Sequence, residues 1–257
     1  MPNELDERTP QLLNDGNNIN VIAKQLPIKV GLGSKLFEIA LWLFVIPGIV
    51  LTILTLINYV FIDIAIDLII FVAGLLPGII YTIKKIKAGN YLSQIQQKVQ
   101  HNASQVDNYL EQRVQILKNT ANLVEKAITL DKETLTSITS LRSNNKTSFT
   151  DEERNQIASD INRASRNIKI AFENYPELRA HESIQKAMSE NSYLQKEITA
   201  AREVYNDSVL RWNTAIYEWP CNMIVAAKRG YTTRIPFTLD MDTKNQARSI
   251  FFDKKQE

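Results

Sequence analysis

The sequence predicts an all-α protein in which an N-terminal transmembrane helical hairpin precedes a bundle of long antiparallel helices. The chain of 257 residues holds only eight glycines and eight prolines, so turns are scarce and long helices are favoured over a many-stranded sheet. Two long apolar segments lie in the first third of the chain. Farther along, apolar residues recur every three or four positions, which is the spacing of an amphipathic helix.

The composition argues against several classes of protein. A formal charge of +2 is too small for a dedicated nucleic-acid binder. The single cysteine, Cys221, cannot form an intramolecular disulfide, and the two histidines, His101 and His181, are too far apart for a local metal motif. No phosphate-binding loop or serine-nucleophile motif is present. We therefore predict a protein that is not an enzyme, with no catalytic residues, no cofactor, no metal and no nucleic-acid partner.

Residues 36–87 are predicted to form the transmembrane hairpin. The nineteen residues between Glu38 and Asn58 carry no formal charge, and a helix of that length spans about 29 Å, close to the thickness of a bilayer core. A second apolar segment, Ile64–Ile83, contains only Asp67 as a charged residue, which is expected to lie near the headgroups or to extend toward them. Two buried core helices are the alternative, but the rest of the chain offers too little apolar surface to cover them.

The two predicted spans share a sequence motif. Residues 45–53 align without gaps to residues 75–83, and each copy carries a Pro-Gly step, at Pro47 and at Pro77. Proline removes a backbone donor and loosens a helix, so we expect kinks that face each other or a neighbouring subunit. A transporter-like broken-helix site is the alternative, although two spans provide few walls for a pathway.

The charges around the hairpin predict its orientation. Lysines lie on both flanks, whereas the connection between the spans, residues 58–67, has neither lysine nor arginine. The positive-inside rule then predicts a two-span protein of the cell membrane with both termini in the cytoplasm. Residues 1–35 show little periodicity and are predicted to be a flexible leader. The lysines that follow the second span are candidates for contact with anionic lipid: Lys84, Lys85 and Lys87.

Three amphipathic helices are predicted in the region 88–237, before a C-terminal tail at 238–257. The first begins near Leu92 and runs for about fifty residues, or roughly 75 Å. The second follows a capping box at Thr150–Glu153 and is stopped by Asn174, Tyr175 and Pro176, because proline restricts the residue before it. The third ends at Pro220.

The unequal helix lengths predict an interaction surface. A second helix of about 25 residues returns only about 37 Å along the first, which would leave the membrane-proximal part of the first helix without a partner in the chain. An uncovered apolar stripe usually marks an interaction face, so we predict that this stalk packs against copies of itself in a homo-oligomer. The predicted interface consists of Leu92, Ile95, Val99, Val106 and Leu110.

Three motifs in the second half of the chain resemble those of the LemA family. They are the turn ENYPELRA at 173–180, the helix segment AREVYNDSV at 201–209 and the segment WPCN at 219–222. The resemblance covers about residues 110–237 and implies a bacterial membrane protein with an N-terminal anchor and an antiparallel, LemA-like helical bundle. This chain lacks the proline of the family's first bundle helix, and it has a hairpin where family members commonly have one span.

The motif residues of the third helix are predicted to be mainly structural. Tyr205 falls on the apolar stripe, with Asn206 and Asp207 beside it. We expect these side chains to bond across to Arg113 or Gln112 of the first helix, as a polar clamp that fixes the register of the bundle. A ligand site is the alternative interpretation.

Together these features predict a non-enzymatic structural or scaffolding protein that self-associates through its helical bundle at the bacterial membrane. The alternative is an accessory subunit that docks a partner membrane enzyme or transporter. The expected partners are therefore the lipid bilayer and further copies of the chain, with a membrane-protein partner under the alternative.

Overall fold

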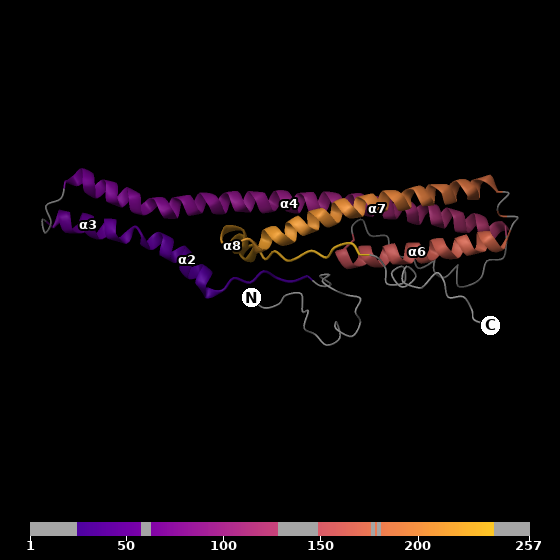
Figure 1. Cartoon of the computed structure of the whole chain (residues 1–257), viewed down its shortest axis with the longest axis horizontal. Helices are drawn as coiled ribbons and strands as arrows, with labels where there is room; N and C mark the ends of the chain where they lie inside the picture. The colour runs from indigo at the N-terminus through magenta and orange to yellow at the C-terminus, as the bar shows by residue number, and fades with distance from the viewer. Residues whose placement is uncertain (1–24, 58–62, 128–148, 176–177, 179–180, 239–257) are drawn as a thin grey trace, which may run out of the picture. The chain divides into compact units, whose positions relative to one another are not determined.

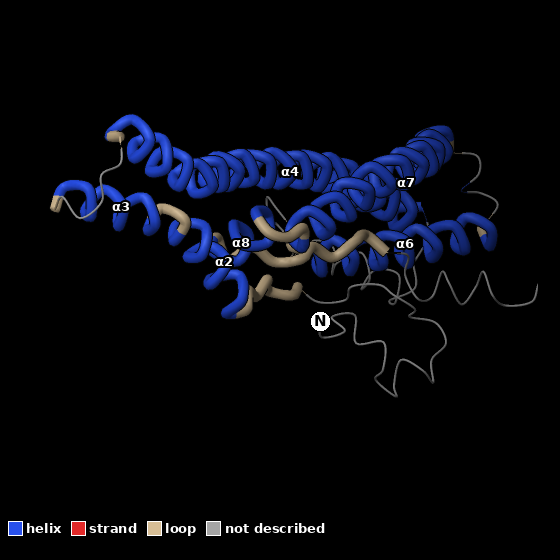
Figure 2. The backbone as a smooth tube through the Cα atoms, turned by 60° about the vertical axis from the view of Figure 1, so that its left-hand side comes forward, coloured by secondary structure: helices blue, strands red, loops and turns tan. Residues whose placement is uncertain are grey.

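The computed structural model describes residues 25–57, 63–127, 149–175, 178 and 181–238. Within these ranges all regular structure is helical, apart from one isolated antiparallel bridge between Pro27 and Thr232, which confirms the all-α fold class (Figures 1 and 2). The helices are α2 (Leu32–Leu43), α3 (Ile46–Leu56), α4 (Ile64–Ala127), α6 (Asp151–Asn174), α7 (Glu182–Tyr217) and α8 (Cys221–Lys228).

The chain folds as two compact units, which are described separately. Among the described residues, the hairpin unit contains 25–97 and 211–234, and the bundle unit contains 98–210 and 235–238. Helices α4 and α7 contribute to both units. The boundary predicted between residues 87 and 88 falls inside α4, because no proline follows Pro77 to end this helix. At 64 residues, α4 combines the predicted second span with the first bundle helix.

In the hairpin unit, the two Pro-Gly steps have different outcomes. The first apolar segment is divided at Phe44 and Val45, and α3 then begins with Pro47 in its first turn, where the missing amide has no intrahelical partner to lose. The second step lies inside α4, which continues through Pro77. The predicted kink is therefore a break between two helices in the first segment only.

The two arms of the hairpin approach each other closely at two glycines. A Cβ atom on Gly48 would lie 2.7 Å from the Cα of Phe71, and one on Gly74 would lie 2.6 Å from the carbonyl oxygen of Phe44. Both distances are shorter than those that Cβ atoms make in proteins, so the two backbones pack at positions where only glycine fits. Such close approach at small residues is typical of helices that associate in membranes.

In the bundle unit, α6 begins at the predicted capping box. The amide of Glu153 donates to the Thr150 hydroxyl at 3.2 Å, and the Thr150 amide donates to the Glu153 carboxylate at 3.0 Å. One face of α6 is buried at Ile157, Ile161, Ala164 and Ile168. Helix α7 runs antiparallel to α4, since Asn102 contacts Val204 and Arg113 contacts Asn191.

The predicted interface of the stalk is wrong, because the chain covers this stripe itself. Leu92, Val106 and Leu110 are fully buried, Val99 is 4 % exposed and Ile95 is half-buried. The reason lies in the third helix: α7 has 36 residues and reaches roughly 54 Å, whereas α6 has 24 residues and reaches roughly 36 Å. In the bundle unit the long helix α7 reaches α4 at Asn102, five residues before the contact of α6 at Asp107.

Part of the predicted flexible leader is ordered. The Leu26 amide donates to the Thr233 hydroxyl at 2.7 Å, the Thr233 amide donates back to the Leu26 carbonyl, and Ile28 is buried. Helix α2 then begins at Leu32, before the predicted start of the hairpin. The flexible-leader prediction is therefore wrong for residues 26–35, and residues 1–24 lie outside the described part of the chain.

Candidate functional site

Arg113 joins three helices of the bundle unit. Its Nε donates to the side-chain oxygen of Asn191 on α7 at 2.8 Å, and one Nη donates to that of Asn162 on α6 at 2.9 Å. Arg113 is only 4 % exposed, and burial lowers its pKa to about 10, because its hydrogen-bond partners carry no compensating negative charge. Asn191 in turn donates to the Ser165 hydroxyl. Arg113 of α4 thus bonds to both α6 and α7.

The partners predicted for Arg113 are nevertheless wrong. Tyr205 lies fourteen residues beyond Asn191 along α7, or roughly 21 Å, and Asn206 and Asp207 lie farther still. The antiparallel register therefore keeps all three away from Arg113. Asn206 instead holds the backbone of Phe237, and Asp207 is exposed.

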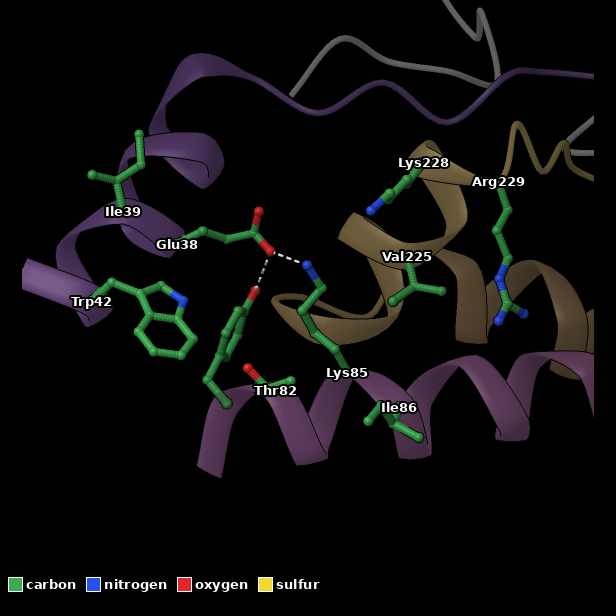
Figure 3. A pocket seen from close by; sticks show the side chains of 10 residues that line it. Glu38, Ile39, Trp42, Thr82, Lys85, Ile86, Val225, Lys228 and Arg229 are labelled. Atoms are coloured by element: carbon green, nitrogen blue, oxygen red, sulfur yellow. Dashed lines mark hydrogen bonds and ion pairs between the residues drawn. The ribbon is translucent and has the colours of Figure 1, made fainter. Parts of the chain in front are cut away.

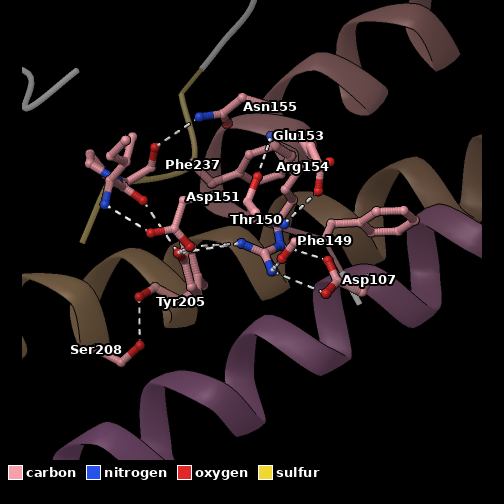
Figure 4. Close-up of polar contacts among 12 residues, drawn as sticks. Asp107, Phe149, Thr150, Asp151, Glu153, Arg154, Asn155, Tyr205, Ser208 and Phe237 are labelled. Atoms are coloured by element: carbon pink, nitrogen blue, oxygen red, sulfur yellow. Dashed lines mark hydrogen bonds and ion pairs between the residues drawn. The ribbon is translucent and has the colours of Figure 1, made fainter. Parts of the chain in front are cut away.

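A second polar cluster surrounds Tyr205 (Figure 4). The Tyr205 hydroxyl donates to Asp151 at 2.9 Å, and Arg154 stacks over the Tyr205 ring at 5.2 Å from its centroid. Arg154 also forms a bidentate ion pair with Asp107 of α4, at 2.6 and 3.0 Å. The second oxygen of Asp151 accepts from the Ile235 amide at 3.1 Å. One cluster thus ties α4, α6 and α7 to the C-terminal segment.

The position of Arg154 in the sequence indicates that its side chain is buried. Arg154 lies three residues before Ile157, which places it on the buried stripe of α6, and Arg113 lies three residues after Leu110 on the stripe of α4. A charged residue at a stripe position needs a buried partner. Asp107 is harder to find, because its partner lies 47 residues away.

Asparagine side chains hold the extended C-terminal segment by its backbone. In the bundle unit, the Phe237 amide donates to the Asn206 side chain at 2.7 Å, and Asn155 binds the amide of Thr238 and the carbonyl of Pro236. Within the hairpin unit, Asn213 accepts from the Arg234 amide at 2.8 Å and donates to its carbonyl. Asn206 and Asn213 are two helical turns apart, so the YN and WN pairs of α7 present one asparagine each to the segment.

The predicted helix stop is described in part. Asn174 is the last residue of α6, and Tyr175 caps it in an extended conformation, donating its amide to the Ala171 carbonyl. Pro176 lies outside the described residues.

The sequence predicts that Asp67 lies near the headgroups or extends toward them, but its side chain does not extend away from the hairpin. It is 6 % exposed, and the hydroxyls of Thr52 and Thr55 on α3 lie 3.4 and 3.3 Å from its two carboxylate oxygens. These hydroxyls lie one turn apart, so a single face of α3 meets the carboxylate. The polar group is thus packed between the two arms of the hairpin.

A cavity of about 630 Å³ lies in the hairpin unit between α2, α4 and α8 (Figure 3). Glu38 of α2 reaches across it and accepts from Lys85 and from the Tyr81 hydroxyl of α4. Apolar and cationic side chains make up most of its lining. These are Ile39, Trp42, Ile86 and Val225 on one hand and Lys85, Lys228 and Arg229 on the other.

The three lysines predicted to contact lipid occupy different surroundings. Lys84 and Lys87 are exposed and line a second cavity of about 500 Å³ with Trp219 and Pro220. Lys85 is half-buried and paired with Glu38. Among the described residues, no group of three His, Cys, Asp or Glu side chains could hold a metal ion.

The helical segments Leu32–Leu56 and Ile64–Val124 each contain a stretch long and apolar enough to cross a membrane. Only 6 % and 17 % of these stretches is buried, unlike the core helices of a soluble protein. By length and composition, these two segments are candidate membrane spans.

The family model of the LemA family matches residues 102–252. Since this match covers more than half of the chain, the protein belongs to the LemA family, in agreement with the resemblance of its three motifs. No curated protein matches the chain.

Proposed function

We propose that this LemA-family protein is a non-enzymatic structural protein of the membrane. In this proposal two spans anchor the helical bundle, and copies of the chain associate through that bundle. The structural role is supported by the contacts that the buried charged side chains make. Arg113, Arg154 and Asp151 are each at most 7 % exposed, and each forms a hydrogen bond with a neighbouring helix or segment. A reactive group must reach a substrate, whereas these groups hold helices together.

The distribution of exposed apolar side chains supports two spans. On α4, large exposed apolar residues extend from Ile64 to Ile86 and Tyr91, and the next one is Leu123. The distance from Ile64 to Ile86 is roughly 33 Å along a helix, which matches a bilayer core. The lysines at 84, 85 and 87 lie at the end of this stretch, so the positive-inside rule supports cytoplasmic termini.

Self-association through the bundle is supported by two exposed apolar side chains of α7. Tyr193 is 62 % exposed and Val204 is 51 % exposed. They lie eleven residues apart, which is close to three full turns, so they share one face of the helix. We propose this face as the contact between copies, in place of the buried stripe of α4.

The mass of the purified full-length protein in mild detergent tests self-association. We expect a defined multiple of the chain mass, and we expect the double variant Tyr193→Ser/Val204→Ser to shift it toward the monomer. The matched control is Ile170→Ser, which removes an apolar residue of similar exposure (55 %) from α6. A wild-type protein that is a monodisperse monomer would contradict the proposal. Crosslinking in cells to one other membrane protein in fixed ratio would favour the accessory-subunit alternative.

A further inference from the structure

We propose that the cavity between α2, α4 and α8 binds one anionic phospholipid. The phosphate contacts Lys228 and Arg229. The part of the acyl chains nearest the headgroup contacts Ile39, Trp42 and Ile86. This inference rests on the membrane anchoring in the proposed function, and it is independent of self-association. The 630 Å³ volume of the cavity is within the range of small-molecule sites.

The cavity lies at the boundary between apolar and polar surface. Its lining on α4 ends at Ile86, beyond which the described part of α4 has large exposed apolar residues only at Tyr91 and Leu123. A tryptophan, Trp42, lines it and is 47 % exposed, and tryptophan favours the interface between headgroups and acyl chains. The site is therefore placed at the depth of a lipid phosphate.

The charges of the cavity favour an anion. Three cations and one carboxylate line it, and the carboxylate of Glu38 is already paired with Lys85. Lys228 is exposed and makes no hydrogen bond or ion pair with the residues that the structure describes. Its ammonium group, at the C-terminal end of α8, is thus available to a phosphate.

Arg229 is fixed beside Lys228 by contacts with α4. One Nη donates to the Gly89 carbonyl at 2.9 Å and to the Ser93 hydroxyl at 3.0 Å. A Cβ atom on Gly89 would lie 2.7 Å from the other Nη, so the guanidinium packs where α4 has no side chain. A cation held in place loses less conformational freedom when it binds a phosphate.

The apolar lining favours a lipid over a soluble phosphate compound. Ile39 and Ile86 are 55 % and 60 % exposed, and they belong to the same cavity as the cations. A free phosphate ion would neutralise the cations and leave these side chains uncovered. A phospholipid would satisfy the charge and cover the apolar surface at once.

The experiment measures lipid binding to the full-length protein in uncharged detergent. The probes are phosphatidylglycerol and phosphatidylcholine with identical acyl chains, and the readouts are retained lipid by native mass spectrometry and the thermal unfolding midpoint. We expect one phosphatidylglycerol to be retained in preference to phosphatidylcholine. Lys228→Gln should weaken this binding roughly tenfold, since a charge-assisted hydrogen bond is lost, and Lys228→Arg should restore it.

The matched control is Lys35→Gln, which removes the same charge from an exposed lysine of the hairpin unit that lies outside the cavity. Equal losses in Lys35→Gln and Lys228→Gln would show diffuse attraction and overturn the site, as would an unchanged Lys228→Gln. Displacement of the lipid by millimolar inorganic phosphate would assign the cations to a soluble anion instead. Flotation with phosphatidylcholine vesicles separates the two proposals: a chain that does not float contradicts the membrane anchor itself, whereas a floating chain without lipid preference overturns only the lipid site.

Discussion

Arg154 of α6 and Asp107 of α4 form a bidentate ion pair, with Nε 2.6 Å from Oδ1 and Nη2 3.0 Å from Oδ2. The side chains are 3 % and 13 % exposed. Burial alone would lower the pKa of Arg154, but the hydrogen bond and charge of Asp107, together with Tyr205 and Asp151, outweigh burial and raise this pKa. The pair links α6 to α4.

Asp107→Asn should destabilise the protein by about 3 kcal/mol, because it leaves the Arg154 charge buried without its main partner. Glu173→Gln is the matched control. It breaks the pair of Lys169 with Glu173, whose side chains are 69 % and 58 % exposed, and exposed pairs contribute little. Chemical unfolding of the purified protein measures both changes. Equal effects of the two variants would show that the buried pair has no special role.

The lowered pKa of Arg113 predicts that the stability of the protein depends on pH in the alkaline range. Its pKa is about 10 in the folded protein, well below the ordinary value of an arginine in an unfolded chain. Between these values the unfolded state binds more protons, so the free energy of unfolding rises with pH. Relative to Arg113→Met, the wild type should gain roughly 1 kcal/mol between pH 8 and pH 10.5. Urea unfolding of both proteins at the two pH values measures this gain, and a constant difference would contradict it.

Gly74→Ala should loosen the hairpin, because the new Cβ would meet the Phe44 carbonyl oxygen at 2.6 Å. Overpacking of this kind typically costs about 1–3 kcal/mol. Gly33→Ala is the control, since a Cβ there has no neighbour within 4 Å and alanine favours a helix more than glycine does. The thermal midpoint in detergent should therefore fall in Gly74→Ala and stay level or rise in Gly33→Ala. A fall in both would refute the close contact.

Two single-cysteine variants test the orientation of the hairpin in a Cys221→Ser background. Asp63→Cys and Glu190→Cys place the thiol at exposed positions, one beside the connection between the spans and one on the bundle. In intact cells a membrane-impermeant maleimide should label only Asp63→Cys, because the positive-inside rule predicts that the connection faces outward. Glu190→Cys should react after permeabilisation. The reverse pattern would invert the topology.

Asn206→Ala should release the C-terminal segment, since Asn206 both accepts from and donates to the backbone of Phe237. The amide of Phe237 should then exchange with deuterium faster, while the core of α4 stays protected. Asn174→Ala, at the exposed end of α6, is the control and should leave this exchange unchanged. Unaltered exchange in Asn206→Ala would mean that other contacts suffice.

The hairpin shows which structural features can be predicted from a local sequence pattern. The length of the segments that lack charged residues predicted the apolar helices. The Pro-Gly steps predicted that these helices would be irregular. Proline alone did not determine that one step would break a helix and the other would not, because this depends on the residues packed beside it. Likewise the charge of Asp67 was visible in the sequence, whereas its neighbours Thr52 and Thr55 come from the opposite arm.

The sequence by itself determined the helical class, the apolar segments, the capping box at Thr150 and Glu153 and the membership of the LemA family. All of these depend on residues close together in the chain or on motifs of fixed spacing. Only the tertiary structure decided that Arg113 bonds to Asn191 and Asn162, that Tyr205 bonds to Asp151, and that the stripe from Leu92 to Leu110 is covered. These outcomes depend on the register between antiparallel helices, which brings together residues far apart in the sequence.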